Sequence, residues 1–204
     1  MDDIVKQAMA KWPEVPDVYG WLALDRRGQW RLKGDVVSNR QIAGFINRNY
    51  DHDGSGCWFF QNGPQRVFVT LDYTPFVYRI VWQPEPGAEL HIEAHTGATV
   101  ERIVSAWLDD AGVILLETEH GIGMLDDRNL DRLLARFTDA GGAVLDENNI
   151  AARLDILQAG GDADLCIQYA GACTPLRAIA AGDVAAKFGF LARPQTPPGA
   201  AICD

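Results

Sequence analysis

The sequence lacks the features that usually indicate a membrane-spanning helix or a common catalytic motif. No apolar run approaches the roughly 20 residues that a membrane-spanning helix needs. The chain has only three serines, at positions 38, 55 and 105, and none stands in a G-x-S-x-G nucleophile motif. Gly121-Ile122-Gly123 has neither the further glycine nor the lysine of a phosphate-binding loop. We therefore expect no membrane partner, no local nucleophilic triad and no nucleotide cofactor.

Cysteine pairs at metal-binding or redox spacing are also missing. The four cysteines stand at positions 57, 166, 173 and 203, and no two of them form a C-x-x-C pair. The first residues, Met1-Asp2-Asp3-Ile4-Val5-Lys6, are acidic and contain no apolar signal segment. We expect reduced thiols and a cytoplasmic location.

Positive charge is in short supply. Lysine and arginine number 18 against 28 aspartates and glutamates, which gives a formal net charge of −10. Such a field repels polyanions, so nucleic acid and anionic membrane surfaces are poor partners for this chain.

What the sequence does contain is an internal similarity. Trp21-Leu22-Ala23-Leu24-Asp25-Arg26-Arg27-Gly28 and Trp107-Leu108-Asp109-Asp110-Ala111-Gly112 both read as a strand that enters a turn. A polar helix start follows each of them, at Ser38-Asn39 and at Asp126-Asp127. The offset is about 86 to 88 residues in both comparisons, which indicates an internal duplication.

The pattern predicts an α+β fold made of two pseudo-repeats of β-hairpin, helix and antiparallel strands. We expect a first repeat with an N-terminal helix over 1–98, a second over 99–193 and a flexible tail over 194–204. A single sheet shared by both halves is an alternative arrangement.

Several local predictions follow from capping and periodicity. Ser38 is expected to cap a helix over 40–50, whose apolar positions Ile42, Phe45 and Ile46 share one face. Short strands are expected at 154–157, 165–169, 176–180 and 185–192, and the stretch 144–152 fits either a helix or a loop.

Two motifs resemble metal-binding sites, but neither has the ligands or the spacing that a metal ion requires. Asp51-His52-Asp53-Gly54-Ser55-Gly56 resembles the start of a calcium loop, but Asn62 stands at position twelve where a bidentate carboxylate is required. His91, Glu93 and His95 share one face of a predicted strand, with the two histidines about 13 Å apart. That separation is too large for one ion, so we expect no metal site.

The most distinctive stretch is Trp58-Phe59-Phe60-Gln61-Asn62-Gly63-Pro64-Gln65-Arg66-Val67. Three consecutive aromatic residues must point to both faces of a strand, and they run into a turn that carries amide and guanidinium groups. The candidate binding residues are Trp58, Phe60, Gln61, Asn62, Gln65 and Arg66. The competing interpretation is that a second layer of the fold covers the aromatic rings.

This stretch, together with Tyr19-Gly20-Trp21-Leu22-Ala23-Leu24-Asp25-Arg26-Arg27-Gly28, resembles an uncharacterised bacterial family of proteins of unknown function. The resemblance covers about the first 140 residues. It implies a small soluble cytoplasmic protein, and it brings no activity and no catalytic residues with it.

Two main functional hypotheses remain, beside a third in which histidine and cysteine side chains from distant positions form a transition-metal site. The first is a non-enzymatic binding module for a small polar ligand or for a protein or peptide partner, with no cofactor. The alternative is a hydrolase-like enzyme that uses His91, Glu93 or His95 as an acid or base at strand ends.

Overall fold

The computed structural model describes residues 1–12, 15–81 and 90–196. Backbone contacts divide the chain into two compact units, Met1–Pro75 with Phe188–Asp204 and Phe76–Lys187. Each unit is built on its own β-sheet, so the described residues of the two halves do not share a sheet.

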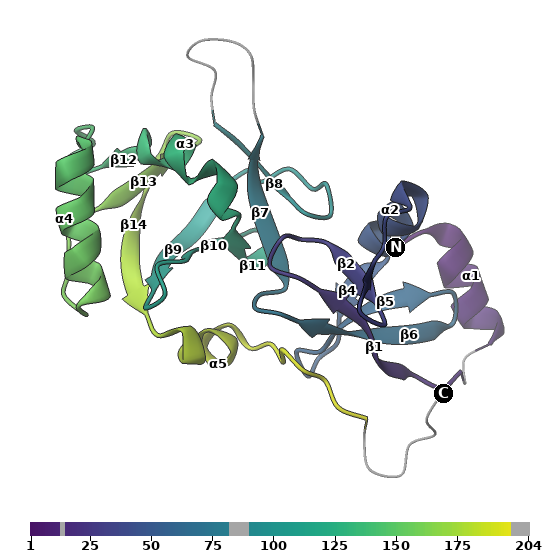
Figure 1. Ribbon diagram of the computed structural model, residues 1–204. Coiled ribbons are helices and arrows are strands. Elements are labelled where there is room, and N and C mark those ends of the chain that lie inside the picture. The colour runs from purple at the N-terminus through teal and green to yellow at the C-terminus, as the bar shows by residue number, and fades with distance from the viewer. Residues whose placement is uncertain (13–14, 82–89, 197–204) are drawn as a thin grey trace. The chain divides into compact units, whose positions relative to one another are not determined.

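The first unit contains a six-stranded sheet with the strand order β3-β2-β1-β6-β5-β4 (Figure 1). Strands β1 and β6 run parallel, and the other neighbouring strands are antiparallel. The elements in chain order are α1 (Asp3–Lys11), β1 (Val18–Leu24), β2 (Trp30–Leu32), β3 (Asp35–Val36), α2 (Arg40–Arg48), β4 (Tyr50–His52), β5 (Trp58–Asn62) and β6 (Gln65–Leu71).

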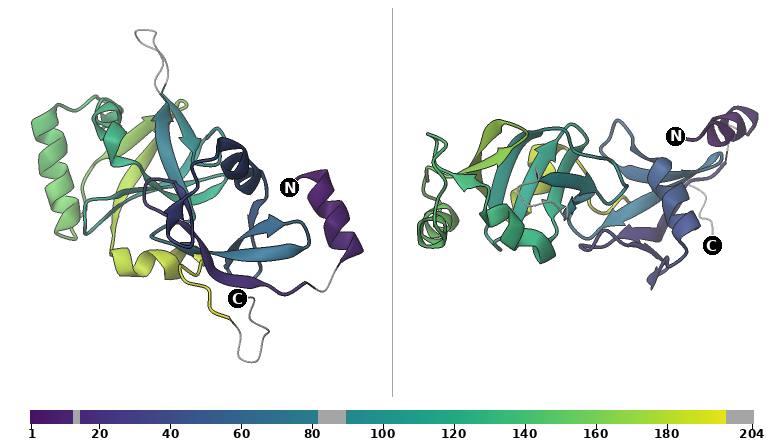
Figure 2. Two further views of the ribbon diagram at one scale, coloured as in Figure 1. Left: turned by 45° about the vertical axis from the view of Figure 1, so that its right-hand side comes forward. Right: turned by 90° about the horizontal axis from the view of Figure 1, so that it is seen from above.

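The second unit contains an eight-stranded sheet with the order β12-β13-β14-β9-β10-β11-β7-β8. Helix α4 contacts β9 and β14 and lies beside β14 in Figures 1 and 2. The elements are β7 (Phe76–Val81), β8 (His91–Ala94), β9 (Ile103–Asp109), β10 (Ile114–Thr118), β11 (Gly121–Leu125), η1 (Asp127–Asn129), α3 (Leu130–Leu134), β12 (Phe137–Thr138), α4 (Glu147–Gln158), β13 (Cys166–Tyr169), β14 (Ala172–Ile179), η2 (Ala181–Asp183) and α5 (Val184–Phe188).

The strand orders confirm the α+β fold with two pseudo-repeats. Reading β9 to β14 in place of β1 to β6 turns the first sheet into the order β11-β10-β9-β14-β13-β12, which is the order found in the second unit. The central pair is parallel in both, as β1 with β6 and as β9 with β14. Strands β7 and β8 extend the second sheet beyond β11, although they precede residue 98.

The core of the first unit lies between the sheet and α2. Leu22, Leu24, Val69 and Leu71 pair across β1 and β6 and are buried. The ring of Phe45 on α2 meets Phe60 edge-on, with centroids 5.5 Å apart. Burial of these side chains supplies the main driving force for forming this layer, at about 25 cal/mol per Å² of apolar surface removed from water.

The N-cap of α2 lies one residue later than predicted. Asn39, not Ser38, is the N-cap, because its side-chain oxygen accepts from the backbone amides of Gln41 and Ile42. Both residue types are good caps, and only the residue directly before the first helical position can reach these amides.

Two predicted strands are helical. Residues 154–157 belong to α4, whose N-cap Asp146 accepts a hydrogen bond from the amide of Asn149. Residues 184–188 form α5, where Ala185 and Ala186 have high helix propensity, and Leu191 makes only an isolated bridge to Cys57. Of the predicted tail, residues 197–204 lie outside the described residues.

Candidate functional site

The aromatic residues predicted as ligand contacts lie on the buried side of the first sheet. Trp58 and Phe60 are each 9% exposed. The Trp58 ring packs against Tyr50 and His52, with centroids 4.8 and 4.9 Å away. Phe60 meets the helix ring of Phe45 described above. The Trp58 and Phe60 rings therefore belong to the core of the first unit, and residues of that same unit cover them.

The remaining predicted residues lie at the β5–β6 turn and beyond it. Asn62 is exposed, while Gln65 and Arg66 are half-buried. Gln61 is 1% exposed and donates from Nε2 to the carbonyl of Gly63, 2.9 Å away. Its Oε1 has no hydrogen-bond partner within the described residues. Gln61 therefore holds the turn, whereas Asn62, Gln65 and Arg66 are the accessible part of the predicted set.

The opposite face of the same hairpin carries a second aromatic cluster. Phe59 faces Phe68 across the β5–β6 pair, and their ring centroids lie 5.8 Å apart. Tyr19 of β1 stacks on Phe68 at 4.5 Å with an angle of 9° between the rings. Phe59 and Phe68 are buried, and Tyr19 is half-buried. The rings of Phe59 and Phe68 thus form an aromatic surface that the Tyr19 ring partly covers.

The guanidinium group of Arg66 lies over this aromatic surface. Its guanidinium carbon is 5.0 Å from the centroid of the Phe59 ring. Its side chain makes no hydrogen bond or ion pair with any described residue. A guanidinium has five N–H donors in a planar fork, so this one can bind a carbonyl or carboxylate from outside. Arginine on an aromatic face keeps its charge while its orientation is fixed.

Asp17 completes this group, and its electrostatics differ from those of a solvated carboxylate. Burial raises the pKa of Asp17 above its usual value, and the charge of Arg66 opposes that rise. Burial also raises the pKa of Tyr19, with the charge of Asp17 adding to the effect. We call Asp17, Tyr19, Phe59, Arg66 and Phe68 the Arg66 patch. It offers a guanidinium donor, a carboxyl acceptor and an aromatic surface within one face of one sheet.

Sequence reasoning found Arg66 and missed the rest of the patch. The signal was available in the alternation of the strands, because side chains at every second position share a face. Arg66 and Phe68 alternate with the buried Val67 and Val69, and Phe59 alternates with Trp58 and Phe60. What the sequence could not show is the parallel pairing of β1 with β6, which places Tyr19 and Asp17 beside them.

The three residues of the predicted acid–base strand have separate environments. His91 and Glu93 are half-buried on β8, and Glu93 pairs with Arg79 of β7 in the register. His95 lies just beyond β8 and is buried, and its Nδ1 accepts a hydrogen bond from the amide of Val77. Burial and then the charge of Arg79 lower the pKa of His95 to about 3. His95 is therefore a neutral structural group at neutral pH.

His91 lines a cavity of about 420 Å³ in the second unit. Glu101, Arg136, Gln168 and Tyr169 also line it. The phenol of Tyr169 is committed, since it donates to the carbonyl of Val100 at 2.6 Å. The side chains of His91, Glu101 and Gln168 make no hydrogen bond with another described residue. This cavity is therefore a polar concave site, and of the predicted acid–base residues only His91 lines it.

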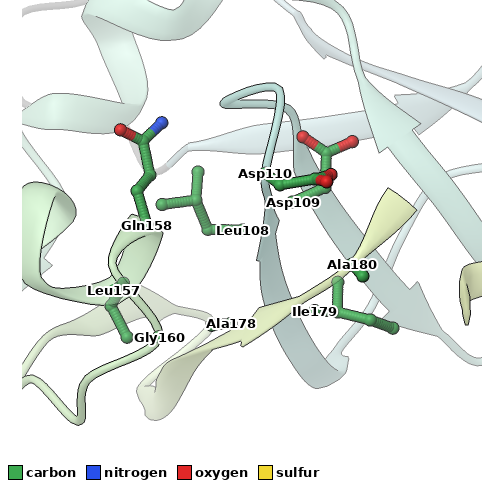
Figure 3. Close-up of a pocket in the computed structure, with 9 residues that line it drawn as sticks. All are labelled: Leu108, Asp109, Asp110, Leu157, Gln158, Gly160, Ala178, Ile179 and Ala180. Carbon is green, nitrogen blue, oxygen red and sulfur yellow. The ribbon is translucent and has the colours of Figure 1, made fainter. Parts of the chain in front are cut away.

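A smaller cavity of about 270 Å³ lies where α4 ends beside β9 and β14 (Figure 3). Its wall is mainly apolar, and the polar groups of Gln158, Asp109 and Asp110 stand on either side of it in Figure 3. The carboxylates are occupied: Asp109 accepts from the turn amides of Ala111 and Val113, and Asp110 accepts from Ala181. This cavity therefore offers a ligand few free polar groups.

The calcium-like loop is a hairpin turn. Asp53 Oδ1 accepts from the amides of Ser55 and Cys57, at 2.9 and 3.0 Å, and Asp51 and His52 belong to β4. Within residues 1–12, 15–81 and 90–196, no three His, Cys, Asp or Glu side chains are grouped so that they could hold a metal ion. No helix in the described residues is long and apolar enough to cross a membrane.

Comparisons with known proteins address the family and the fold. The sequence matches the family model DUF2944, described as "Protein of unknown function (DUF2946)", over residues 1–195. The comparison with curated proteins gives no match.

Two solved structures resemble the chain. A DUF1285 family protein from Silicibacter pomeroyi DSS-3 has 13% sequence identity and a TM-score of 0.53, over 79% of this chain and 81% of that chain. A DUF1285 family protein from Shewanella baltica OS155 has 16% identity and a TM-score of 0.42, over 58% of this chain and 90% of that chain. At this identity, the first similarity shows a shared fold and no more.

Proposed function

The chain belongs to this DUF2946 family of proteins of unknown function, whose description names no activity, and we propose that it is a non-enzymatic module that binds a peptide segment of a partner protein. The observation that carries the proposal is Arg66, whose guanidinium rests on the Phe59 ring and makes no hydrogen bond or ion pair with the described residues. Gln61 is opposite Arg66 in the register and lies on the same face, Asn62 and Gln65 stand next along the hairpin, and Trp58 and Phe60 pack on the other face.

A peptide matches the chemistry of the Arg66 patch. Backbone carbonyls of a peptide are acceptors for the guanidinium, and backbone amides are donors for the carboxyl group of Asp17. An apolar side chain of the peptide has an aromatic surface available at Tyr19. Because peptide groups are neutral, the net charge of −10 does not repel them as it would repel a polyanion.

The test is a selection of peptides from a phage-displayed library on the immobilised wild-type protein. A selected peptide is then synthesised, and its Kd is measured by fluorescence anisotropy with the wild type, Arg66→Gln and Arg40→Gln. Arg40 is an exposed arginine on α2 in the same unit and serves as the matched control. Hydrogen bonds from a charged donor contribute about 1.5–3 kcal/mol, so Arg66→Gln should weaken binding about tenfold or more.

Thermal unfolding of both variants separates binding from folding. We expect Arg66→Gln to keep its melting temperature within a few degrees of the wild type while losing affinity, and Arg40→Gln to bind normally. A library that yields no binder, or a peptide that binds Arg66→Gln as tightly as the wild type, would overturn the proposal.

The hydrolase-like alternative is favoured by one observation, the position of His91 in the cavity with Glu101, Arg136 and Gln168. An imidazole beside a cavity is suited to general acid–base chemistry near neutral pH. The test is the hydrolysis of p-nitrophenyl acetate by the wild type, His91→Ala and His52→Ala, compared with free imidazole at the same concentration. A rate above that of imidazole that falls only in His91→Ala supports the alternative. Equal rates for the three proteins exclude it for this substrate class.

A further inference from the structure

The β13–β14 hairpin brings two cysteines together on one face of the second sheet. Cys166 is opposite Pro175 in the register, and Gln168 is opposite Cys173. Residues that face each other, and their neighbours two positions away, lie on the same side of a sheet. Cys166 and Cys173 are therefore diagonal neighbours across the pair, on one face of the sheet.

The two thiols differ in their access to solvent. Cys173 is exposed, and its sulfur lies 3.6 Å from Thr138 Oγ1 and 3.9 Å from the carbonyl oxygen of Asp139. Cys166 is buried behind it. Burial, and then the neighbouring Cys173 side chain, raise the pKa of Cys166 to about 12. Cys166 is thus a protonated thiol at neutral pH, and an oxidant from solution meets Cys173 first.

We propose that Cys166 and Cys173 form an oxidation site at which hydrogen peroxide produces a reversible intramolecular disulfide. The Cys173 thiolate attacks one peroxide oxygen, the O–O bond breaks, and the departing hydroxide takes a proton to become water, which leaves a sulfenic acid. The Cys166 thiol, losing its proton, attacks the Cys173 sulfur, and the sulfenic oxygen leaves as a second water. Two thiols and one peroxide thereby give one disulfide and two waters.

The diagonal geometry argues for a bond that is easily reduced again. Diagonal neighbours in an antiparallel pair are about 7–8 Å apart at Cα, whereas disulfides usually span about 4.4–6.8 Å. Closure therefore requires the two strands to shift locally, and strained disulfides are the reducible ones.

The equivalent hairpin of the first unit has no pair of thiols. In its equivalent hairpin, β5–β6, the residues at the corresponding register positions are Phe59 and Arg66, which make the cation–π contact of the Arg66 patch. The same diagonal position holds a guanidinium over a ring in one half and a pair of thiols in the other. The oxidation site is therefore separate from the proposed peptide site.

The experiment uses the full chain with Cys57→Ser and Cys203→Ser, so that Cys166 and Cys173 are the only thiols. The protein is treated with a small excess of hydrogen peroxide and followed by intact mass and peptide mapping. We expect the loss of two hydrogens, a peptide that links the two cysteines within one chain, and full recovery with dithiothreitol. Adding Cys173→Ser should abolish the link, and circular dichroism checks that this variant is folded.

A second measurement tests the assigned order without any variant at the pair. Iodoacetamide applied to the reduced, folded protein should modify Cys173 and leave Cys166 unmodified. The proposal is overturned if peroxide leaves both thiols free, if it drives Cys173 to the sulfinic acid while Cys166 stays a thiol, or if the only disulfides formed join two chains.

Discussion

Gln61 and Gln168 hold the same place in the two halves of the chain. The backbone amide of Gln61 donates to the carbonyl of Asn49, and that of Gln168 donates to the carbonyl of Arg136, both at 2.8 Å. Each donor lies on the first strand of a hairpin, and each acceptor lies just after a helix. Together with the matching strand orders, this shows that the duplication extends to individual backbone contacts. The side chains have diverged, because Gln61 holds its turn while Gln168 lines a cavity.

Two aspartates define the duplicated hairpin turns. Asp25 Oδ1 accepts from the amides of Arg27 and Gln29, and Asp109 Oδ1 accepts from the equivalent amides of Ala111 and Val113. Both carboxylates are buried, so their removal leaves backbone donors without these acceptors. We expect Asp25→Ala and Asp109→Ala each to lower the free energy of unfolding by about 1–3 kcal/mol. Urea denaturation followed by fluorescence measures it.

Asp35→Ala is the control for both substitutions, since Asp35 is exposed on β3. Its free energy of unfolding should stay within about 0.5 kcal/mol of the wild type. If the two turn variants were no less stable than this control, the carboxylate–amide bonds would not hold the turns.

Gly56 is the point where the chain after α5 approaches the first sheet. Its φ is +79°, and a Cβ built there would lie 2.2 Å from the carbonyl oxygen of Gly189. The amide of Leu191 donates to the carbonyl of Gly56 at 2.9 Å. We expect Gly56→Ala to destabilise the protein by about 1–2 kcal/mol from backbone strain alone and to release this segment.

Hydrogen exchange of the Leu191 amide is the direct readout, and it should accelerate in Gly56→Ala. Gly54→Ala is the matched control, because a Cβ at Gly54 meets nothing within 4 Å and its φ is not positive. Equal exchange in the two variants would show that the segment does not depend on the close approach at Gly56.

Gly123 allows β11 to pack against the Tyr78 ring. A Cβ at this position would lie 2.4 Å from Cε2 of Tyr78, a residue that is fully buried. The Tyr78 phenol is fixed by Thr118, 2.7 Å away, so the ring has little freedom to move aside. We expect Gly123→Ala to cost about 1–3 kcal/mol by overpacking, measured by thermal unfolding. Gly182→Ala, where a Cβ meets nothing within 4 Å, should be neutral or slightly stabilising.

Local patterns predicted most of the strands and the duplication, and long-range pairing accounts for what they missed. The Asn62-Gly63 signal and the alternation after it correctly placed β5 and β6. The segment 185–192 was assigned to a strand because its apolar residues are compatible with either structure, and no local feature shows that Leu191 returns to Cys57. Likewise, His95 follows a strand whose alternation places it with His91, but the strand ends at Ala94 and the next residue is buried.

His95 should make the stability of the protein depend on pH. Its pKa in the folded protein is lowered to about 3, whereas an unfolded histidine titrates near 6.5. Below pH 6.5 the unfolded chain therefore binds a proton that the folded protein does not, and stability falls as the pH falls. At pH 5 this difference contributes about 2 kcal/mol of destabilisation relative to pH 7.5.

In His95→Asn the side-chain oxygen can still accept from the Val77 amide without titrating, so that variant should lose this part of the pH dependence. Urea denaturation at pH 5 and pH 7.5, with the exposed His52→Asn as the control, measures the effect. If His95→Asn kept the full pH dependence of the wild type, another group would be responsible for it.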